Sequence, residues 1–582
     1  MFTKVLVANR GEIAIRIFRT LREMGIGSAA VYSEADRDAP FVAYADEAYL
    51  IGPGPAAQSY LMSETIVRTA LRAGADAVHP GFGFLAENAG FARACAAAGL
   101  VFVGPPPDAI EAMGSKISAR ETMERAGVPV IPGTNAPVAS VEQALEIAEG
   151  IGYPVAVKAS AGGGGKGIEV AEDAGELERA FESARRQGKA YFADDTVFME
   201  RYLQSPRHVE VQVLADSHGS VIHLGERDCS IQRRHQKILE ETPSPAVGPE
   251  LRERIGRIGI DAARAVGYVN AGTVEGLLTA DGTYYFLEMN TRLQVEHTIT
   301  EEVTGLDLVR EQLRIAAGEP LSLTQDDVEL RGHSIQCRIN AEDPARDFVP
   351  TPGRVTRYRE PAGPGVRIDS GVVEGSTISD LYDPMIAKLV VRDHDRDAAR
   401  RRMLRALSEF EIGGVSSLIP IHRAILEHPD FIAGRTMHDF VEGGGYAAAL
   451  EPEEGAALDG RLPAEAELRT VVAEVDGKRF EVAVSVPEHP GRTRLRARRA
   501  AMADREGRQH GAHDVIRSPM QGTVLKVNVG EGDEIAAGQV LVVVEAMKME
   551  NEIVSRQAGV VQAVGVAAGD QVANGAELIR LA

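Results

Sequence analysis

The chain has 582 residues, of which 44% are hydrophobic and 25% charged, as in an ordinary soluble globular protein. Its 63 basic and 85 acidic residues give a net charge of −22, which argues against a general affinity for nucleic acid or for an anionic membrane. The three cysteines, Cys95, Cys229 and Cys337, lie far apart, which argues against a disulfide framework or a zinc cluster. We therefore expect a soluble, cytoplasmic protein of about four domains.

The first 110 residues alternate between strand-like and helix-like segments. Apolar runs at 5–8, 29–32, 77–79 and 101–103 predict strands, and apolar residues spaced three to four apart predict a helix over 12–24. Such alternation is typical of a parallel, doubly wound sheet.

A glycine-rich loop follows the apolar run at 155–158. The loop contains GxGxxG at Gly162, Gly164 and Gly167, but the next residues, 168–170, read as a strand rather than as the helix that a dinucleotide-binding loop requires. No Ser or Thr follows Lys166, so a Walker loop is excluded as well. The pattern predicts a strand–loop–strand flap whose amides close over phosphates, with a plain surface loop as the alternative.

Two apolar runs, 273–278 and 284–290, are joined through Asp281-Gly282, which predicts a hairpin with a two-residue turn. That register pairs Ala280 with Thr283 and Glu275 with Glu288, and it puts Asn290 on the same face. Facing carboxylates destabilise a sheet unless a cation lies between them, and three oxygen ligands suit Mg²⁺. The alternative is an exposed hairpin with unpaired acids.

Two further segments are dense in polar residues. In 290–297, Arg292 is suited to holding a small oxyanion and Glu296 to acting as a base. The segment 226–237, taken alone, is more typical of a salt-bridged surface than of a site, and His79 and His208 are structural by default.

The C-terminal residues contain an internal repeat. Gly522, Val524, Gly532 and Asp533 recur 37 positions later as Gly559, Val561, Gly569 and Asp570, which predicts a β-sandwich of two similar halves. Between the halves lies 545–550 (EAMKME), where a turn would present Lys548 to solvent. The preceding 446–510 reads mostly as linker, with a small hairpin over 471–486.

In these motifs the chain resembles the α subunits of biotin-dependent acyl-CoA carboxylases, in which an ATP-grasp biotin carboxylase is fused to a C-terminal biotin carboxyl carrier domain. The resemblance rests on seven motifs, at 8–14 (ANRGEIA), 79–88 (HPGFGFLAEN), 162–167 (GGGGKG), 226–237 (ERDCSIQRRHQK), 288–297 (EMNTRLQVEH), 338–342 (RINAE) and 545–550 (EAMKME).

The resemblance implies a multidomain α/β fold. Its parts would be an N-terminal domain with a doubly wound parallel sheet (1–114), an ATP-grasp domain (115–330), a mixed α/β C-terminal carboxylase domain (331–445), a linker or β-subunit-contact region (446–510) and an all-β biotinyl sandwich (511–582). The family reaction is the ATP- and bicarbonate-dependent carboxylation of biotin through carboxyphosphate, a ligase activity.

The resemblance also assigns site residues. ATP would be bound by Lys116, Lys158, Gly163, Gly164, Gly165, Lys166, Gly167, Glu200, His208, Gln232 and His235. Mg²⁺, with Mn²⁺ as an alternative ion, would be held by Glu275, Glu288 and Asn290. Bicarbonate would meet Lys237, Arg292, Gln294 and Val295. Glu296 would be the catalytic base and Arg338 would stabilise the enolate of biotin, with Lys237 and Arg292 as further catalytic groups. Biotin would be attached to Lys548 and would enter a pocket of Phe82, Gly83 and Arg338.

The implied partners are a separate carboxyltransferase β subunit and, transiently, a biotin protein ligase, with the chain forming a homo-oligomer within an α/β complex. No nucleic acid or membrane partner is expected. A lipoyl domain is the alternative for 511–582, and a carboxylase half that has lost activity, or an ATP-grasp ligase unrelated to biotin, are alternatives for the whole chain. Three departures from the family pattern are Phe82 in place of a common Tyr, Thr298 in place of Pro, and the segment 414–420.

Overall fold

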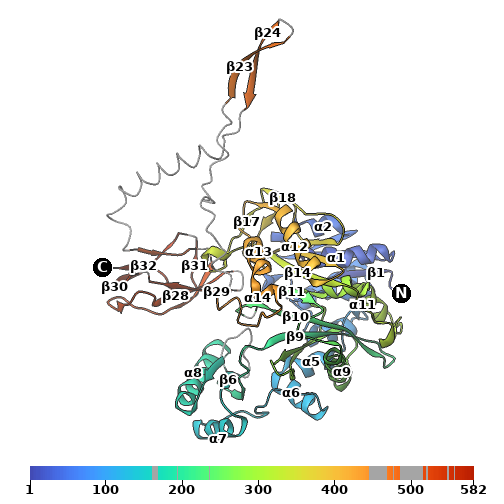
Figure 1. Ribbon diagram of the computed structural model, residues 1–582, viewed down its shortest axis with the longest axis vertical. Coiled ribbons are helices and arrows are strands. Elements are labelled where there is room, and N and C mark those ends of the chain that lie inside the picture. Colours follow the sequence, from blue (N-terminus) through green and yellow to red (C-terminus); the bar gives the residue numbers. More distant parts are fainter. Residues whose placement is uncertain are drawn as a thin grey trace. The chain divides into compact units, whose positions relative to one another are not determined.

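The computed structural model describes residues 1–159, 168–192, 194–234, 236–444, 468–475, 478–485, 515–519, 522–546, 549–555, 557–573 and 575–581, without the side chains of 116–117, 190–192, 468–475, 478–485, 546 and 549–550. The chain divides into two compact units, Met1–Leu450 and Glu451–Ala582 (Figure 1). Among the described residues, no helix is long and apolar enough to cross a membrane.

A parallel five-stranded sheet of order β3-β2-β1-β4-β5 opens the first unit. On the central strand, Val5 and Val7 pack against α1, whereas Leu6 packs against α3 and α4 on the other face. Helices therefore cover both faces, and the predicted doubly wound sheet is confirmed. The elements are β1 (Lys4–Val7), α1 (Gly11–Glu23), β2 (Gly27–Ser33), α2 (Pro40–Tyr44), β3 (Glu47–Gly52), α3 (Ser63–Ala73), β4 (Ala77–His79), α4 (Ala89–Ala97) and β5 (Val101–Phe102).

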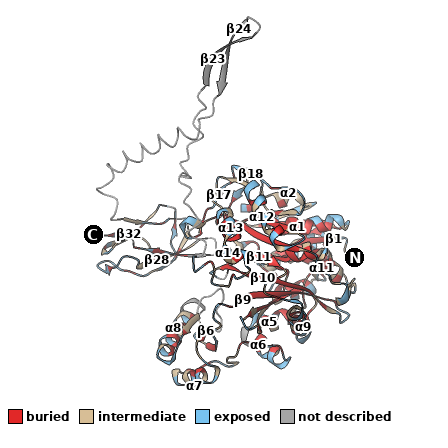
Figure 2. Cartoon of the chain, in the orientation of Figure 1, coloured by how far each residue is buried: buried red, intermediate tan, exposed pale blue. Residues whose placement is uncertain are grey.

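An eight-stranded sheet of order β13-β12-β9-β10-β11-β14-β21-β19 forms the centre of the first unit, and every described pair of neighbours is antiparallel. It joins strands from both sides of residue 330, and its strands are largely buried (Figure 2). The strands are β9 (Arg207–Ala215), β10 (Val221–Arg233), β11 (Gln236–Thr242), β12 (Asn270–Leu278), β13 (Tyr284–Asn290), β14 (His333–Asn340), β19 (Val366–Ser370) and β21 (Met385–Asp393).

Helices flank this sheet. Among them, α9 packs its Ile255 and Gly259 against the valines of β9, and α10 contacts β11 and β14. The helices are α5 (Pro107–Gly114), α6 (Lys116–Arg125), α9 (Pro249–Ala265), α10 (His297–Thr304), α11 (Leu308–Ala316), α12 (Arg396–Glu409), α13 (Ile419–Glu427) and α14 (Pro429–Ile432). Short two-stranded pairings complete this part, with β15 (Glu342–Asp343), β16 (Val349–Pro350), β17 (Gly353–Arg354), β18 (Arg357–Arg359), β20 (Thr377–Ile378) and β22 (Glu411–Gly413).

A smaller antiparallel sheet of order β7-β6-β8 carries the glycine-rich loop between its first two strands. Lys158 pairs with Ile168 across the loop, so the predicted strand–loop–strand unit is confirmed, while the loop itself, 160–167, lies outside the described residues. The elements are α7 (Val141–Ile151), β6 (Val155–Ala159), β7 (Ile168–Ala171), α8 (Ala174–Phe192) and β8 (Val197–Arg201).

The second unit contains an antiparallel hairpin, β23 (Leu468–Val475) with β24 (Lys478–Ser485), at the predicted place. Two four-stranded sheets follow, of order β25-β32-β30-β27 and β29-β28-β26-β31. The strands are β25 (Val515–Arg517), β26 (Gly522–Val527), β27 (Glu534–Ile535), β28 (Val540–Ala546), β29 (Met549–Val554), β30 (Gly559–Val564), β31 (Gln571–Val572) and β32 (Glu577–Leu581).

The 37-residue repeat reappears in these two sheets as equivalent contacts. The Gly530 N–H donates to Asp533 Oδ2 at 2.7 Å, and 37 positions later the Ala567 N–H donates to Asp570 Oδ2 at 2.8 Å. Adding 37 to the residues of β26 gives those of β30, and each repeat contributes strands to both sheets. The predicted two-fold β-sandwich is therefore confirmed.

Candidate active site

The candidate site lies on one face of the eight-stranded sheet. Strand β9 alternates between valines, which pack against α9, and the polar residues His208, Glu210 and Gln212, which lie on the opposite face. Glu210 stands opposite Glu275 of β12, and Glu275 stands opposite Glu288 of β13. Three carboxylates on neighbouring strands thus share one face. Their negative charges repel one another unless cations lie close enough to neutralise them.

Lys237 on β11 supplies one of these cations. Its Nζ lies 2.5 Å from Glu210 Oε2, 2.8 Å from Glu275 Oε1 and 2.7 Å from Glu296 Oε1. Burial works against the charge on Lys237, but these carboxylates raise its pKa well above the usual value. Lys237 is therefore a permanently charged group at the meeting point of three acids.

The predicted magnesium ligands meet on this face, although the expected turn is wrong. Thr279, rather than Ala280, closes the turn onto Thr283 through an N–H···O bond of 2.9 Å, so the loop has three residues. This shifts the register by one residue, and an irregularity between Glu275 and Gly276 shifts it back. The Glu275–Glu288 pairing is thus confirmed by way of a β-bulge that the turn motif did not reveal.

The chemistry of this donor set fits a divalent cation of the magnesium type. Glu275 is buried, Glu288 is half-buried, and both offer carboxylate oxygens, while Asn290 offers an amide oxygen. Burial alone would raise the pKa of Glu275, but Lys237 and His208 hold it well below the usual range, so the carboxylate is ionised. Asn290 Nδ2 donates to Glu275 Oε1 at 2.7 Å, which fixes the orientation of the amide.

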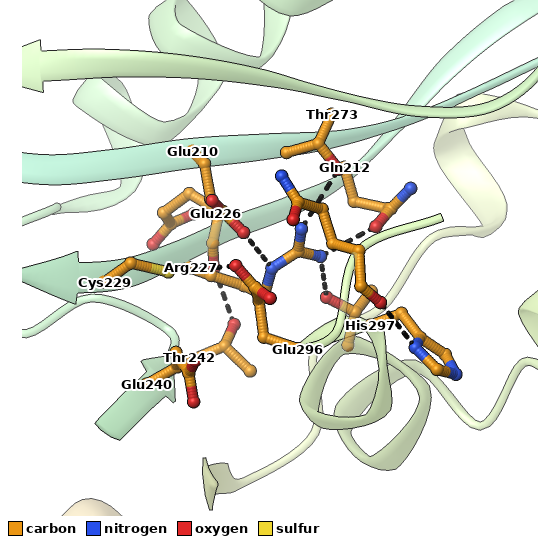
Figure 3. A network of polar contacts seen from close by, with 12 residues as sticks. Glu210, Gln212, Glu226, Arg227, Cys229, Glu240, Thr242, Thr273, Glu296 and His297 are labelled. Carbon is orange, nitrogen blue, oxygen red and sulfur yellow. Dashed lines mark hydrogen bonds and ion pairs between the residues drawn. The ribbon is translucent and has the colours of Figure 1, made fainter. Parts of the chain in front are cut away.

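A second buried cation, Arg227 on β10, pairs with Glu210 (Figure 3). Its guanidinium is fully buried and donates to Glu210 Oε1 at 2.5 Å, to Gln212 Oε1 at 2.7 Å, to Thr300 Oγ1 at 3.0 Å and to Thr273 Oγ1 at 3.1 Å. Residues 226–232 of the segment that sequence reasoning alone treated as surface are instead buried.

Glu296, the predicted base, lies where the loop after β13 enters α10, and it is fully buried. Its Oε1 accepts from Lys237, and its Oε2 accepts from Arg338 Nη2 at 2.9 Å. Burial would raise the pKa of Glu296, but Lys237, Arg338 and Arg227 hold it well below the usual range. The carboxylate is therefore ionised at neutral pH, which is the form that a general base requires.

The predicted bicarbonate residues belong to the same hydrogen-bond network. Arg292 donates to Asn290 Oδ1 at 2.7 Å and to Gln294 Oε1 at 3.1 Å, and Gln294 Nε2 donates to Glu275 Oε1 at 2.7 Å. The Val295 carbonyl accepts from Lys388 Nζ at 3.3 Å. Cations and ionised acids therefore surround the position at which a small anion would bind.

The predicted ATP residues lie on two sheets. Lys158 and Glu200 form an ion pair between β6 and β8, whereas His208 and Gln232 lie on β9 and β10. Lys116 begins α6, but its side chain is not described. His235, Lys548 and the loop residues Gly163, Gly164, Gly165, Lys166 and Gly167 lie outside the described residues.

The loop that carries the predicted biotin-pocket residues is tightly held. Asn9 Nδ2 donates to the carbonyls of Pro80 and Phe82, each at 2.7 Å, and the Gly81 N–H donates to His79 Nδ1 at 3.1 Å. Gly81 has φ +64°, and a Cβ there would lie 2.9 Å from Asn9 Nδ2. The Lys388 Nζ lies 5.6 Å from the centre of the Phe82 ring.

Sequence reasoning missed three buried residues of the site, Glu210, Glu240 and Lys388. The sequence of β9 alternates polar residues with valine, which marks Glu210 as a member of the polar face of a strand. That this polar face is buried is known only from the structure. Lys388 interrupts the apolar part of β21, residues 385–391, and is fully buried. Glu240 has no comparable signal in the sequence.

Comparisons with known proteins agree with this arrangement. Family models match the chain as Biotin carboxylase, N-terminal domain (1–110), Carbamoyl-phosphate synthase L chain, ATP binding domain (115–324), Biotin carboxylase C-terminal domain (336–443) and Biotin-requiring enzyme (514–581).

Two curated relatives match almost end to end. The biotin-dependent acyl-coenzyme A carboxylase alpha3 subunit of Mycobacterium leprae is 43% identical, with 99% of this chain and 98% of that protein covered. The propionyl-CoA carboxylase alpha chain of Ruegeria pomeroyi is 40% identical, with 98% and 99% covered. Among solved structures, the biotin carboxylase domain dimer of Hydrogenobacter thermophilus 2-oxoglutarate carboxylase, in complex with MgADP, ADP and bicarbonate, is 47% identical. It matches with a TM-score of 0.73 over 77% of this chain and 99% of that one.

Proposed function

The chain belongs to the biotin carboxylase family and carries its own biotin carrier domain, and from this we propose that it is the α subunit of an acyl-CoA carboxylase. The observation that carries the proposal is the arrangement of Lys237, Glu296 and Arg338, in which one ionised acid lies between two cations beside the carboxylates of β9, β12 and β13. This arrangement suits the activation of bicarbonate.

In the proposed first step, bicarbonate binds against Lys237 and Arg292, and Glu296 accepts its proton. A bicarbonate oxygen then forms a bond to the γ-phosphorus of ATP as the bond from that phosphorus to the ADP oxygen breaks, giving carboxyphosphate and ADP. The cations that hold Glu296 ionised also face the negative charge that develops on the transferred group. Their positions are fixed before substrate binds, so little reorganisation is required.

Two bound groups complete the proposal. Mg²⁺, held by Glu275, Glu288 and Asn290, would supply positive charge to the ATP phosphates. Biotin on Lys548 would supply the acceptor nitrogen in the pocket of Phe82, Gly83 and Arg338. The register of β28 with β29 pairs Ala546 with Met549, the residues on either side of 547–548, and this pairing supports the proposal that Lys548 is the modified lysine.

The remaining assignments extend the same proposal. The five domains would be 1–114, 115–330, 331–445, 446–510 and 511–582, with 446–510 contacting a carboxyltransferase β subunit that selects the acyl-CoA. A biotin protein ligase would modify Lys548, and the chain would form a homo-oligomer within the α/β complex. The three cysteines are buried free thiols, which suits a cytoplasmic location.

The test uses the full-length biotinylated chain with Mg-ATP and labelled bicarbonate. We expect ATP-dependent label on the protein, and we expect Glu296→Ala to abolish it while biotin remains attached to Lys548. Glu253→Ala, at a side chain that is 74% exposed on α9, is the control and should behave as the wild type. Unchanged labelling in Glu296→Ala would overturn the role of the base. Addition of the co-purified partner with acetyl-, propionyl- and longer acyl-CoA then identifies the acceptor.

A further inference from the structure

A chain of buried polar side chains leads away from Arg338 into the protein. Glu240 on β11 stands opposite Gln336 on β14, and Arg338, two residues further along β14, points to the same side. Thr298, the second residue of α10, reaches the same place from the helix. Glu240, Gln336 and Thr298 are fully buried, so each of their polar groups requires a partner inside the protein.

The hydrogen bonds among these residues converge on Glu240 from two sides. The Thr298 hydroxyl donates to Gln336 Oε1, Gln336 Nε2 donates to Glu240 Oε2 at 3.0 Å, and Arg338 Nε donates to Glu240 Oε1 at 2.6 Å. Burial raises the pKa of Glu240 and Arg338 opposes that shift, but both oxygens of Glu240 accept a donor, which is the hydrogen-bond pattern of an ionised carboxylate. Arg338 then reaches Glu296 through Nη2, and among the described residues its Nη1 has no hydrogen-bond partner.

Within this hydrogen-bond network, the Gln336 side-chain amide is the group that could turn over and exchange the positions of its oxygen and its NH₂ group. An ionised Glu240 accepts only, so Gln336 must present its NH₂ group to Glu240 and its oxygen to Thr298. A hydroxyl can donate or accept, so Thr298 satisfies either orientation of the amide. Without the hydroxyl, the far end of Gln336 has no partner in either orientation.

We propose that Glu240, Gln336 and Thr298 are positioning residues, which hold the Arg338 guanidinium by its Nε edge so that its Nη groups remain directed at Glu296 and at the incoming cofactor. This rests on the proposed role of Arg338. It also gives Thr298 a function in this chain, at a position where the family pattern has proline, which lacks a hydroxyl.

A double-mutant cycle tests the proposal, with Glu240→Gln, Thr298→Val and the double variant in the full-length biotinylated chain. In Glu240→Gln the new amide places an NH₂ group against that of Gln336, so Gln336 must turn over, and the Thr298 hydroxyl can then accept from it. We expect labelling of the protein to slow about tenfold in Glu240→Gln and about twofold in Thr298→Val, with the KM for ATP unchanged.

The double variant is the decisive measurement, because residues that belong to one hydrogen-bond network do not act independently. We expect its labelling rate to differ by at least about twofold from the product of the two single effects. Ser334→Ala is the structural control: it removes a buried hydrogen bond of 2.8 Å to Val391 O from the same face of β14 without touching the chain, so it should lower stability without slowing labelling.

The outcomes separate the two claims. Absence of ATP-dependent label in the wild type would overturn the proposed function itself. If the wild type is labelled but the labelling rate of the double variant equals the product of the two single effects, the proposal that these residues position Arg338 would be overturned. An equal loss of rate in Ser334→Ala would show that the variants act through stability alone, which would also overturn it.

Discussion

Arg227 carries its charge in the interior of the protein, with its side chain fully buried and Glu210 as its ionised partner. Removing one partner of a buried pair leaves the other charge uncompensated, which typically costs about 3–5 kcal/mol. Lys237 still pairs with Glu210 in Arg227→Met, so we expect the variant to lower the free energy of unfolding of the first unit by no more than about this amount, as measured by chemical denaturation.

The matched control is Arg257→Met on the exposed face of α9. Arg257 and Glu253 form an ion pair of 3.0 Å whose side chains are 71% and 74% exposed. Such pairs contribute less than about 1 kcal/mol, so the control should unfold almost as the wild type does. If the free energy of unfolding falls equally in Arg227→Met and Arg257→Met, the buried hydrogen bonds of Arg227 contribute no more to stability than an exposed ion pair does.

Glu342 is a residue whose charge state should change near neutral pH. Burial raises the pKa of Glu342 to about 7, although Asn340 Nδ2 donates to it at 3.1 Å. The folded protein therefore keeps a proton that the unfolded chain has lost, and stability falls as the pH rises from about 4.5 to about 7. Above that window the full cost, about 3 kcal/mol at most, is present.

We expect Glu342→Gln to remove this dependence. Thermal unfolding of the variant should occur at a higher temperature than that of the wild type at pH 8, with a much smaller difference at pH 5. Glu253→Gln, at the exposed position used above, provides the comparison. A gain of stability that is the same at both pH values would rule out titration of Glu342 as its cause.

The loop after β4 is held in its conformation by side chains that lie far from it in the sequence. Phe84 has φ +42°, a strained value for a bulky residue, and its ring stacks on Tyr60 at 4.9 Å between centroids. Asn9 holds the same loop through two carbonyls. The side chain of Phe82, which is proposed to line the biotin pocket, is therefore placed by distant residues rather than by its own backbone preferences.

We expect Asn9→Ala to raise the KM for free biotin as acceptor by about tenfold, because two hydrogen bonds of about 1 kcal/mol each are lost from the loop. Its effect on ATP cleavage should be small. Asn88→Ala is the control, since Asn88 caps α4 by accepting from the Phe91 N–H at 2.8 Å and should affect stability alone. An unchanged KM in Asn9→Ala would mean that the loop holds its shape without the clamp.

The hairpin β12–β13 shows how far local patterns can be read. Its strands, the facing pair Glu275 and Glu288, and the shared face of Asn290 all followed from alternation and a turn motif. The three-residue turn and the compensating bulge did not, because both depend on how the strands pack against the rest of the sheet. Glu240 was missed for the same reason, since its partner Arg338 lies 98 residues away in sequence.

At the scale of the whole molecule, the two units have separate interiors. Leu389 of the first unit and Leu578 of the second are both fully buried. Replacing a buried leucine by alanine typically costs about 2–5 kcal/mol. We expect calorimetry to resolve two transitions, with Leu578→Ala lowering only one of them and Leu389→Ala only the other. A single transition that moves in both variants would show that the units unfold together.

The repeat in the second unit also fixes where the carrier is attached to the rest of the chain. The pairs Val515–Arg580 and Ile516–Ile579 are the counterparts, 37 positions apart, of Glu552–Val543 and Ile553–Val542 in the β28–β29 hairpin. The two ends of the sandwich chain thus occupy the symmetry-related position of the connection that contains Lys548.

These two positions lie at opposite ends of the sandwich. Near the start of β30, Val561 pairs with Leu581, at the C-terminal end of the sandwich. Beyond the other end of β30, Gly569 and Asp570 exchange backbone hydrogen bonds with Val524. Val524 in turn pairs with Val544, near the end of β28. The seven residues of β28 correspond to about 23 Å of extended strand. If Lys548 carries biotin as proposed, the folded domain would act as a rigid spacer, and its own length would separate the modified lysine from the point where the domain joins the rest of the chain.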